Sequence, residues 1–287
     1  MNSKIREILL IVFGAVFLAT VGVLAGMYTE QRREAAMAAE VAALLVEDPT
    51  PTPAETSPAE PSAPAETPTP TKRPVPHTAQ HDPSQDQQSL ILEKFTKLTE
   101  ANPDTIGWLR IENTKIDNVV MWTPAEPDKY LHLDFFGKPS DWGTLYLDGQ
   151  CNIDTSDNLI IYGHHMRDGT MFGNLIYYAD KNYWSSHRYL TFDTIYEERT
   201  YEVAAAFYGR VLRVEEEGFR YYKYRDAETE EDFNEFKSFI EEHQCYDTGI
   251  EIEYGEQLLT LSTCAYQTEN GRFAIVCRRV TGQETTE

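Results

Sequence analysis

The sequence predicts a mainly β domain of the α+β class, in which about eight strands form a closed or nearly closed barrel behind an N-terminal apolar helix. Eight short segments are rich in β-branched and aromatic residues and are separated by Gly, Pro, Asn and Asp. Two further segments have the apolar spacing of amphipathic helices. Closure into a barrel is favoured because it leaves no strand edge exposed.

Residues 8–28 read ILLIVFGAVFLATVGVLAGMY and carry no charge. At about 1.5 Å per residue such a helix crosses a hydrocarbon core of about 30 Å. We therefore predict a transmembrane anchor after a cytoplasmic tip at residues 1–7. The alternative is a cleaved signal peptide, whose apolar region would be about 7–15 residues long and end at a small-residue site. Ala25-Gly26-Met27 fits such a site poorly.

The segment after the anchor predicts a spacer. Residues 29–46 are expected to continue as a juxtamembrane helix, and residues 47–87 contain 11 of the chain's 15 prolines among Thr, Ala, Ser and Glu. Such a composition buries too little apolar surface to fold and forms an extended, semi-rigid stalk. Basic residues flank the anchor on both sides, so the stalk indicates the orientation: the N-terminus is expected inside the cell and the folded domain, residues 88–287, outside it.

The folded domain begins with a short amphipathic helix at residues 89–102, which ends before Pro103. A second amphipathic helix is expected at residues 230–243, whose acidic start suits the helix dipole. Strands are expected at residues 106–111, 116–121, 144–147, 159–162, 189–192, 201–212, 258–262 and 273–280.

Charge and cysteine content exclude several functions. The formal net charge of −22 leaves no basic stripe to bind nucleic acid. The four cysteines form no C-x-x-C pair and have no histidine at metal-ligand spacing, so neither a metal nor another cofactor is expected. A disulfide, for example between Cys151 and Cys245, stays open, although a domain of this size needs none.

Cys264 stands at the end of a predicted strand, LTLSTC, and precedes a loop at residues 265–271. A cysteine at a strand end is placed to be exposed and reactive, whereas one within a strand packs as a small hydrophobe. Cys277 is of the packing kind. Cys264 is therefore the candidate nucleophile.

Two other strand ends supply partners for such a nucleophile. The strand NLIIY is followed by Gly163, His164 and His165, and Arg272 begins the strand after the loop. A cysteine nucleophile needs an imidazole that exchanges its proton and protonates a leaving amine. A fixed cation would stabilise the oxyanion. Alone, a histidine at a strand end is more often structural, and an arginine is often a surface residue.

These segments together resemble the sortases. The resemblance rests on TLSTC at residues 260–264, IYGH at residues 161–164 and Arg272 at the start of the last strand. NPDTIGW at residues 102–108, the run YGHHMRDGTMFGNLIYY from residue 162 to 178 and the helix ahead of TLSTC are similar to class B. The resemblance covers about residues 88–280.

The family resemblance implies an eight-stranded sortase barrel on the outer face of a Gram-positive cell membrane. It implies a cysteine transpeptidase in which Cys264 attacks the Thr carbonyl of an NPxTx or SPxTG-like sorting signal and forms a thioester. His164 would protonate the leaving amine, and Arg272 would stabilise the oxyanion. An amine of a peptidoglycan precursor, or of a pilin, would then accept the acyl chain.

The sequence also departs from the family. Relatives often have Asn where this chain has His165, so His165 is a rival to His164, which we assign because it follows Tyr-Gly. Glu126-Pro127-Asp128 stands where relatives place an Asn, which puts that contact in doubt. Family position implies candidate substrate contacts whose alternative is ordinary barrel packing. These are Leu131, Tyr222, Tyr224, Ser262 and Thr263.

Three other functions remain to be weighed against wall anchoring by transpeptidation. The first is pilin polymerisation, and the second is hydrolysis by a thiol peptidase of a different fold, which would ordinarily have a third residue orienting the histidine. The third is a stalked scaffold with an inactive site. If Cys264 and His164 exchange a proton, activity should have a bell-shaped dependence on pH.

Overall fold

The computed structural model describes residues 3–45, 91–265 and 269–281. The chain divides into two compact units, Met1–Leu44 and Leu45–Glu287. The predicted stalk at residues 47–87 and the first residues of the predicted folded domain, 88–90, lie outside the described residues.

The first unit is the helix α1, Ser3–Leu44. Within the described residues it is the one helix long and apolar enough to cross a membrane, by length and composition, and the stretch concerned is Val12–Leu44. It is a candidate membrane anchor. The helix continues from the predicted anchor through most of the predicted juxtamembrane segment.

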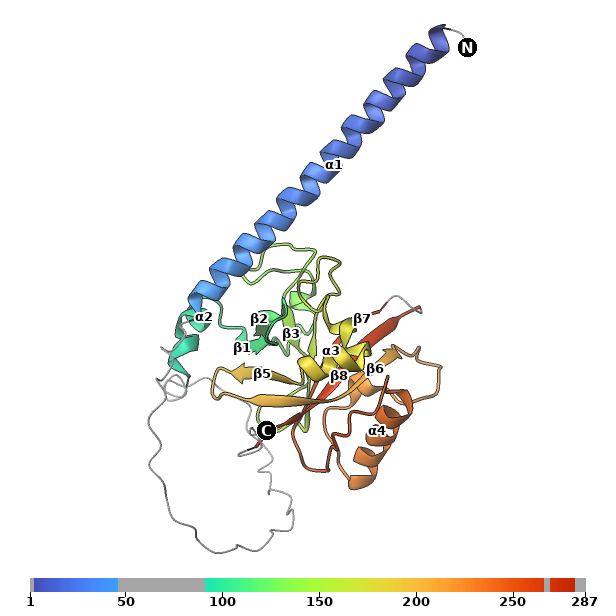
Figure 1. Ribbon diagram of the computed structural model, residues 1–287. Helices are drawn as coiled ribbons and strands as arrows, with labels where there is room; N and C mark the ends of the chain where they lie inside the picture. The colour runs from blue at the N-terminus through green and yellow to red at the C-terminus, as the bar shows by residue number, and fades with distance from the viewer. Residues whose placement is uncertain (1–2, 46–90, 266–268, 282–287) are drawn as a thin grey trace, which may run out of the picture. The chain divides into compact units, whose positions relative to one another are not determined.

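The second unit contains the predicted barrel. Eight strands close in the order β1-β2-β3-β4-β7-β8-β6-β5. Figure 1 shows β6, β7 and β8 side by side in this unit. Each predicted strand is formed, with bounds shifted by one or two residues. The strands are β1 Thr105–Arg110, β2 Asp117–Met121, β3 Leu145–Leu147, β4 Asn158–Tyr162, β5 Tyr189–Thr194, β6 Thr200–Arg210, β7 Leu258–Cys264 and β8 Gly271–Arg279.

The ends of β4 and β7, which are far apart in the sequence, lie side by side in the barrel. β7 lies between β4 and β8, pairing in parallel with β4 and antiparallel with β8. β2 and β3 form the other parallel pair, and the remaining neighbours are antiparallel. Parallel strands end at the same side of a sheet, so the segments after β4 and β7 emerge at one end of the barrel.

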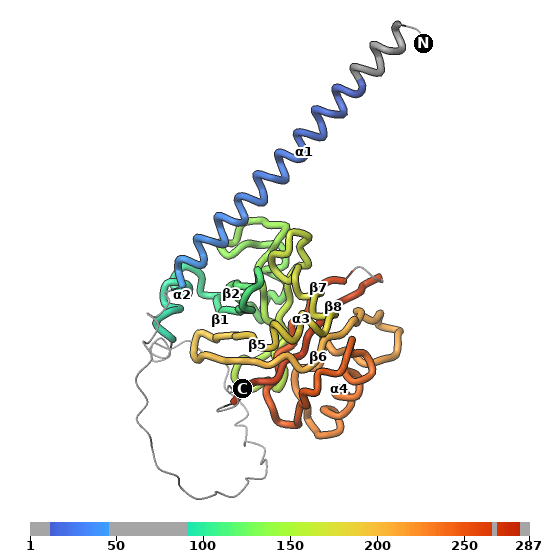
Figure 2. The backbone as a smooth tube through the Cα atoms, viewed as in Figure 1, coloured from blue at the N-terminus to red at the C-terminus, as the bar shows by residue number. Residues whose placement is uncertain are grey.

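Helix α4, Glu230–His243, has the bounds that the sequence predicts. It begins with a capping box in which Thr229 and Asp232 satisfy each other's backbone N–H groups. Its apolar face, with Phe233, Phe236 and Ile240, packs in one cluster with side chains of β6, β7 and β8. Figure 2 shows α4 beside β6. Each large apolar side chain buried here contributes about 1.5–3 kcal/mol.

The other helices of this unit are short. η2 and α2 together form the predicted first helix, which begins at residue 93 rather than at 89. The remaining four were not predicted, since three to six residues are too few to show a helical period. Their bounds are η2 Glu93–Phe95, α2 Thr96–Ala101, η3 Lys129–Leu131, η4 Leu175–Ala179, α3 Lys181–Ser186 and η5 Tyr221–Lys223.

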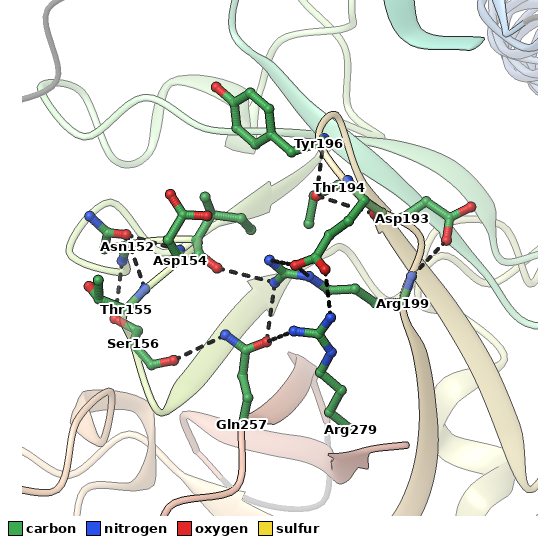
Figure 3. Close-up of polar contacts among 12 residues, drawn as sticks. Asn152, Asp154, Thr155, Ser156, Asp193, Thr194, Tyr196, Arg199, Gln257 and Arg279 are labelled. Carbon is green, nitrogen blue, oxygen red and sulfur yellow. Dashed lines mark hydrogen bonds and ion pairs between the residues drawn. The ribbon is translucent and has the colours of Figure 1, made fainter. Parts of the chain in front are cut away.

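A cluster of hydrogen-bonded polar side chains lies at the start of β7. The Gln257 side-chain oxygen accepts hydrogen bonds from Arg199 and Arg279, both at 3.2 Å (Figure 3). Although burial acts to raise it, hydrogen bonds from Arg279 and Arg199 hold the pKa of Glu197 below its usual range. Gln257 directly precedes β7, whereas Cys264 ends it. This cluster therefore lies at the end of the barrel opposite to the end that carries Cys264.

Candidate active site

Strand register brings the predicted nucleophile and its partners to one end of the barrel. In the parallel β4–β7 ladder Tyr162 is the Cα partner of Ser262, so His164 and Cys264 each stand two residues beyond this last pair. In the antiparallel β7–β8 ladder Cys264 is the Cα partner of Arg272. The three predicted catalytic residues thus meet through two ladders, although one hundred residues separate His164 from Cys264.

Cys264 and Arg272 form a close cross-strand pair. The N–H of Ala265 donates to the carbonyl of Gly271 at 3.0 Å, which makes those two residues the hydrogen-bonded pair and the Cys264–Arg272 pair the non-hydrogen-bonded one. Side chains of a non-hydrogen-bonded pair stand closer together, with Cα atoms about 4.5 Å apart. Arg272 Nη1 also donates to the Gly271 carbonyl, at 3.0 Å. A backbone N–H and a guanidinium therefore converge on one oxygen beside the thiol.

Gly163 joins the ends of β4 and β7 at a position with no room for a side chain. Its N–H donates to the Ser262 carbonyl at 3.3 Å, and its carbonyl accepts the Thr263 hydroxyl at 2.7 Å. A Cβ at this position would collide with the side chains of Leu145 and Phe172. Glycine between Tyr162 and His164 thus has a steric explanation, since a larger residue at position 163 would displace His164.

His164 is held by the main chain of η3. Its Nε2 lies 2.7 Å from the carbonyl oxygen of Leu131. A carbonyl only accepts, so Nε2 carries the hydrogen, and the neutral ring keeps Nδ1 as its basic nitrogen. A backbone carbonyl therefore orients this histidine, the task that a side-chain Asn or Asp performs in other thiol enzymes. Sequence could not reveal this orienting group, because it is not a side chain.

His165, the predicted rival, makes a different contact. Its Nδ1 lies 2.9 Å from the backbone carbonyl oxygen of Cys264. The two adjacent histidines therefore have separate partners: Leu131 for His164 and the main chain of the nucleophile for His165.

Two buried tyrosines that sequence reasoning missed lie near Ser262. The Tyr221 hydroxyl is 3.0 Å from the Ser262 hydroxyl, and Tyr146 is the Cα partner of Tyr162, which in turn pairs with Ser262. Burial raises the pKa of Tyr221 to about 12, and it also raises the pKa of Tyr146. Both phenols therefore stay protonated at neutral pH.

A partly buried ion pair holds η5 against β3 and β4. Arg225 donates to both oxygens of Asp148, at 2.8 Å each. The Tyr162 hydroxyl lies 3.2 Å from an Asp148 oxygen and 3.3 Å from the carbonyl oxygen of Tyr222. Bidentate pairs of this kind fix geometry as well as contributing energy. η5 is thereby tied to β3 and β4, and Tyr221 is held against Ser262, with 3.0 Å between the hydroxyls.

The candidate substrate contacts fall in different surroundings. Tyr222 is half-buried, and its hydroxyl bonds the backbone of Leu212. Ser262 and Thr263 are buried beside Cys264 with their hydroxyls already engaged. Tyr224 stacks on Phe236 of α4, with ring centroids 4.1 Å apart, which favours core packing over substrate contact.

The four cysteines are free thiols of unequal character. Burial raises the pKa of Cys151 to about 12, and it also raises the pKa of Cys277 and of Cys245. In a group with a raised pKa the unreactive thiol form persists to higher pH. Of the four, Cys151 and Cys277 are buried, Cys245 is exposed and Cys264 is partly exposed.

We therefore expect limiting iodoacetamide at pH 7 to label Cys264 first. Cys245 should follow as pH rises, and Cys151 and Cys277 should react only after unfolding. Peptide mapping by mass spectrometry measures this, with Cys245→Ala as the variant that removes the exposed competitor. Equal labelling of all four thiols in the native protein would contradict this ranking and would support an inactive scaffold.

The chain is similar to known proteins over most of its length. No family model matches the chain. Sortase B of Listeria monocytogenes is 27% identical and sortase B of Staphylococcus aureus 25% identical, each over 194 residues that cover 67% of this chain and 76% of the relative. Over two thirds of its length the chain is similar to the class B sortases.

Solved structures of sortase B share this fold. The B. anthracis enzyme in complex with AAEK1 matches with a TM-score of 0.58 and 27% identity, covering 67% of this chain and 86% of that one. A Staphylococcus aureus sortase B–substrate complex matches with a TM-score of 0.60 and 24% identity, covering 69% and 89%. This sortase is accordingly a cysteine transpeptidase with the eight-stranded barrel that its sequence predicts.

Removing the guanidinium of this sortase should mainly slow catalysis. We expect Arg272→Ala to lower kcat about 10²–10³-fold, the usual effect of deleting an oxyanion donor. Arg272→Lys should recover part of the loss, because the charge remains while the planar fork is lost. Steady-state kinetics on a sorting-signal peptide measure both. Arg110→Ala, which breaks a surface ion pair with Asp117, is the matched control. An Arg272→Ala enzyme with unchanged kcat would contradict the role.

Proposed function

We propose that this sortase cleaves a C-terminal sorting signal after its Thr and transfers the new carbonyl end to an amine of a peptidoglycan precursor. The observation that carries the proposal is the pair of ladders that sets His164, Cys264 and Arg272 at one barrel end. The solved substrate complex of Staphylococcus aureus sortase B supports a sorting-signal peptide as the donor. NPxTx or SPxTG-like motifs are the expected donors.

The first half-reaction forms the thioester. The Cys264 thiolate attacks the Thr carbonyl carbon, and the carbonyl electrons move onto oxygen. Arg272 meets this oxyanion, because it is the cross-strand neighbour of the nucleophile. When the oxyanion collapses, the C–N bond breaks and the imidazolium of His164 gives its proton to the leaving amine. The acyl chain remains on sulfur, and His164 is left neutral.

The second half-reaction reverses these roles. An incoming amine attacks the thioester carbonyl, neutral His164 takes the amine's proton, and the Cys264 thiolate leaves. The thiolate and imidazolium are thus restored without net gain or loss of protons. Because both charged forms must be present together, kcat/KM should rise and then fall with pH.

Donor recognition is proposed for the surface around these residues. Leu131 lies on η3, which contacts His164, and Ser262 and Thr263 lie on β7, which carries Cys264. Tyr222 lies on η5, whose Tyr221 contacts Ser262. Arg225 and Asp148 hold η5 in place. They would therefore shape the peptide-binding surface without contacting the peptide themselves. The partly engaged hydroxyls of Ser262 and Thr263 would act through their remaining hydrogen-bond capacity.

The location proposed for this activity follows from α1. An uncleaved helix would anchor the enzyme in the cell membrane with its N-terminus inside. The proline-rich residues 47–87 would then act as a stalk that carries the catalytic domain outside, where wall precursors are assembled. Protease added to intact cells should release the catalytic domain if this orientation holds, and protection from protease would contradict it.

Transfer and hydrolysis are separated by one experiment. The enzyme is incubated with a sorting-signal peptide and increasing amounts of an oligoglycine or diamino-acid acceptor, and products are measured by mass spectrometry. Ligated product that increases with acceptor at the expense of acid supports transpeptidation. Acid alone at every acceptor concentration would overturn it. The shared barrel disfavours a thiol peptidase of a different fold, and ligation to a pilin lysine in preference to the wall amine would favour polymerisation.

A further inference from the structure

His165 lies where side-chain and backbone contacts extend the β4–β7 ladder past its last pair. Beyond Tyr162 and Ser262, Gly163 exchanges hydrogen bonds with Ser262 and Thr263. His165 then bonds the next residue of the other strand, with 2.9 Å between its Nδ1 and the Cys264 carbonyl oxygen. The end of β4 is thus tied to β7 residue by residue as far as the nucleophile.

The direction of this last hydrogen bond is fixed by chemistry. A carbonyl oxygen has no hydrogen to give, so Nδ1 of His165 is the donor and must be protonated. The ring itself is anchored through its backbone, because His165 forms a β-bridge with Met171. A ring fixed at its base therefore presents one N–H to the main chain of Cys264.

The hydrogen bond from His165 fixes one end of a rigid group. The carbonyl of Cys264 and the N–H of Ala265 belong to the same planar peptide unit and point in opposite directions. His165 holds the carbonyl at one end, and the Gly271 carbonyl accepts the N–H at the other, at 3.0 Å. Hydrogen bonds at both ends restrain this peptide unit, which is bonded directly to the Cα atom that carries the Cys264 side chain.

We propose that His165 is a positioning residue for the nucleophile: its Nδ1–H holds the Cys264–Ala265 peptide, and thereby the thiolate, in line with His164 and Arg272. This rests on the proposed acyl transfer at Cys264. His165 itself neither gives nor takes a proton in the reaction. Removing its hydrogen bond frees the peptide, and a misplacement of about 1 Å at a reacting group can cost about 100-fold in rate.

The covalent structure of the side chains offers a sharp test. The amide nitrogen of asparagine is as many bonds from Cα as Nδ1 of histidine, whereas that of glutamine is one bond farther. In full-length enzyme in detergent, His165→Asn should therefore keep kcat within about threefold, while His165→Gln and His165→Ala lower it about 10- to 100-fold. KM for the sorting-signal peptide should stay unchanged in all three, and thermal unfolding checks that each is folded.

Two results would overturn the proposal. An alanine variant as fast as the wild type would show that the hydrogen bond does not matter. A His165→Asn variant as slow as His165→Gln would show that an N–H donor at the Nδ1 position is not sufficient. This result is expected if His165 rather than His164 is the general acid.

A second measurement does not depend on activity. Long-range ¹H–¹⁵N spectra of ¹⁵N-histidine-labelled enzyme, assigned with His165→Asn, should show His165 as the Nδ1–H tautomer. The Nε2–H tautomer would overturn the proposal even if transfer occurs. If instead the wild type makes no thioester while the Nδ1–H signal is present, the acyl transfer has failed and the contact itself stands.

Discussion

Cys264→Ala is expected to abolish the thioester and to lower turnover of a sorting-signal peptide about 10⁴-fold or more, as removal of other covalent nucleophiles does. Without the Cys264 thiol no thioester can form, so both hydrolysis and transfer should disappear. Binding of the peptide should survive, because the methyl group of alanine leaves η3, η5 and β7 in place.

Cys245→Ala is the matched control for this variant. Cys245 is also a free thiol and is exposed, but its backbone N–H bonds Ala206 of β6, away from the strand ends that form the site. Its replacement should leave kcat unchanged. A Cys264→Ala enzyme that still forms ligated product, or a Cys245→Ala enzyme that does not, would place the nucleophile elsewhere.

His164→Ala should lower kcat about 10²–10⁴-fold, the range of a general acid–base group. The loss has a specific cause, since the leaving amine departs without a proton. An ester analogue of the scissile amide releases an alcohol, which needs protonation less. We expect the variant to lose much less activity on the ester than on the amide, and competition kinetics on the two substrates measure the difference.

The control for this variant is His243→Ala, which removes an exposed histidine of α4 whose Nδ1 contacts the Phe239 carbonyl. It should be as active as the wild type on both substrates. Equal losses on amide and ester for His164→Ala would mean that this ring only supports the fold. Full activity of His164→Ala would transfer the general-acid role to another group.

The barrel and α4 were predictable because their signals are local. Eight runs of β-branched and aromatic residues marked the strands, and the spacing of Phe233, Phe236 and Ile240 marked the apolar face of α4. The place of Cys264 at the end of β7 and its partial exposure were predictable too, because a strand end is less covered than a strand interior; its role as nucleophile stays a prediction. The short helices η4 and α3 were missed, since they contain too few residues to show a period.

The contacts within the site were not predictable from sequence. The orienting group of His164 is the backbone carbonyl of Leu131, which no residue type marks. Tyr146 and Tyr221 come from β3 and η5, and only the folded barrel brings them near Ser262, the residue two positions before Cys264. Contacts between residues far apart in the sequence could not be predicted, because the register between distant strands depends on the whole closed sheet.

For the two adjacent histidines, sequence predicted the location but not the contacts. Their place after β4 was predicted from a buried-looking strand that stops at Gly163. The choice between the two rested on resemblance, and the structure supplies a physical distinction: His164 contacts Leu131, whereas His165 contacts the carbonyl of Cys264. The assignment of His164 as general acid stays a prediction until the ester comparison is made.

The central claim is that an acyl chain is carried on Cys264. Intact-protein mass spectrometry, on enzyme mixed with a sorting-signal peptide and quenched in acid, tests it most directly. The account predicts a mass increase equal to the peptide up to its Thr, located on Cys264 by proteolytic mapping and lost on adding an acceptor amine. No such adduct under single-turnover conditions, or one located on another residue, would contradict it.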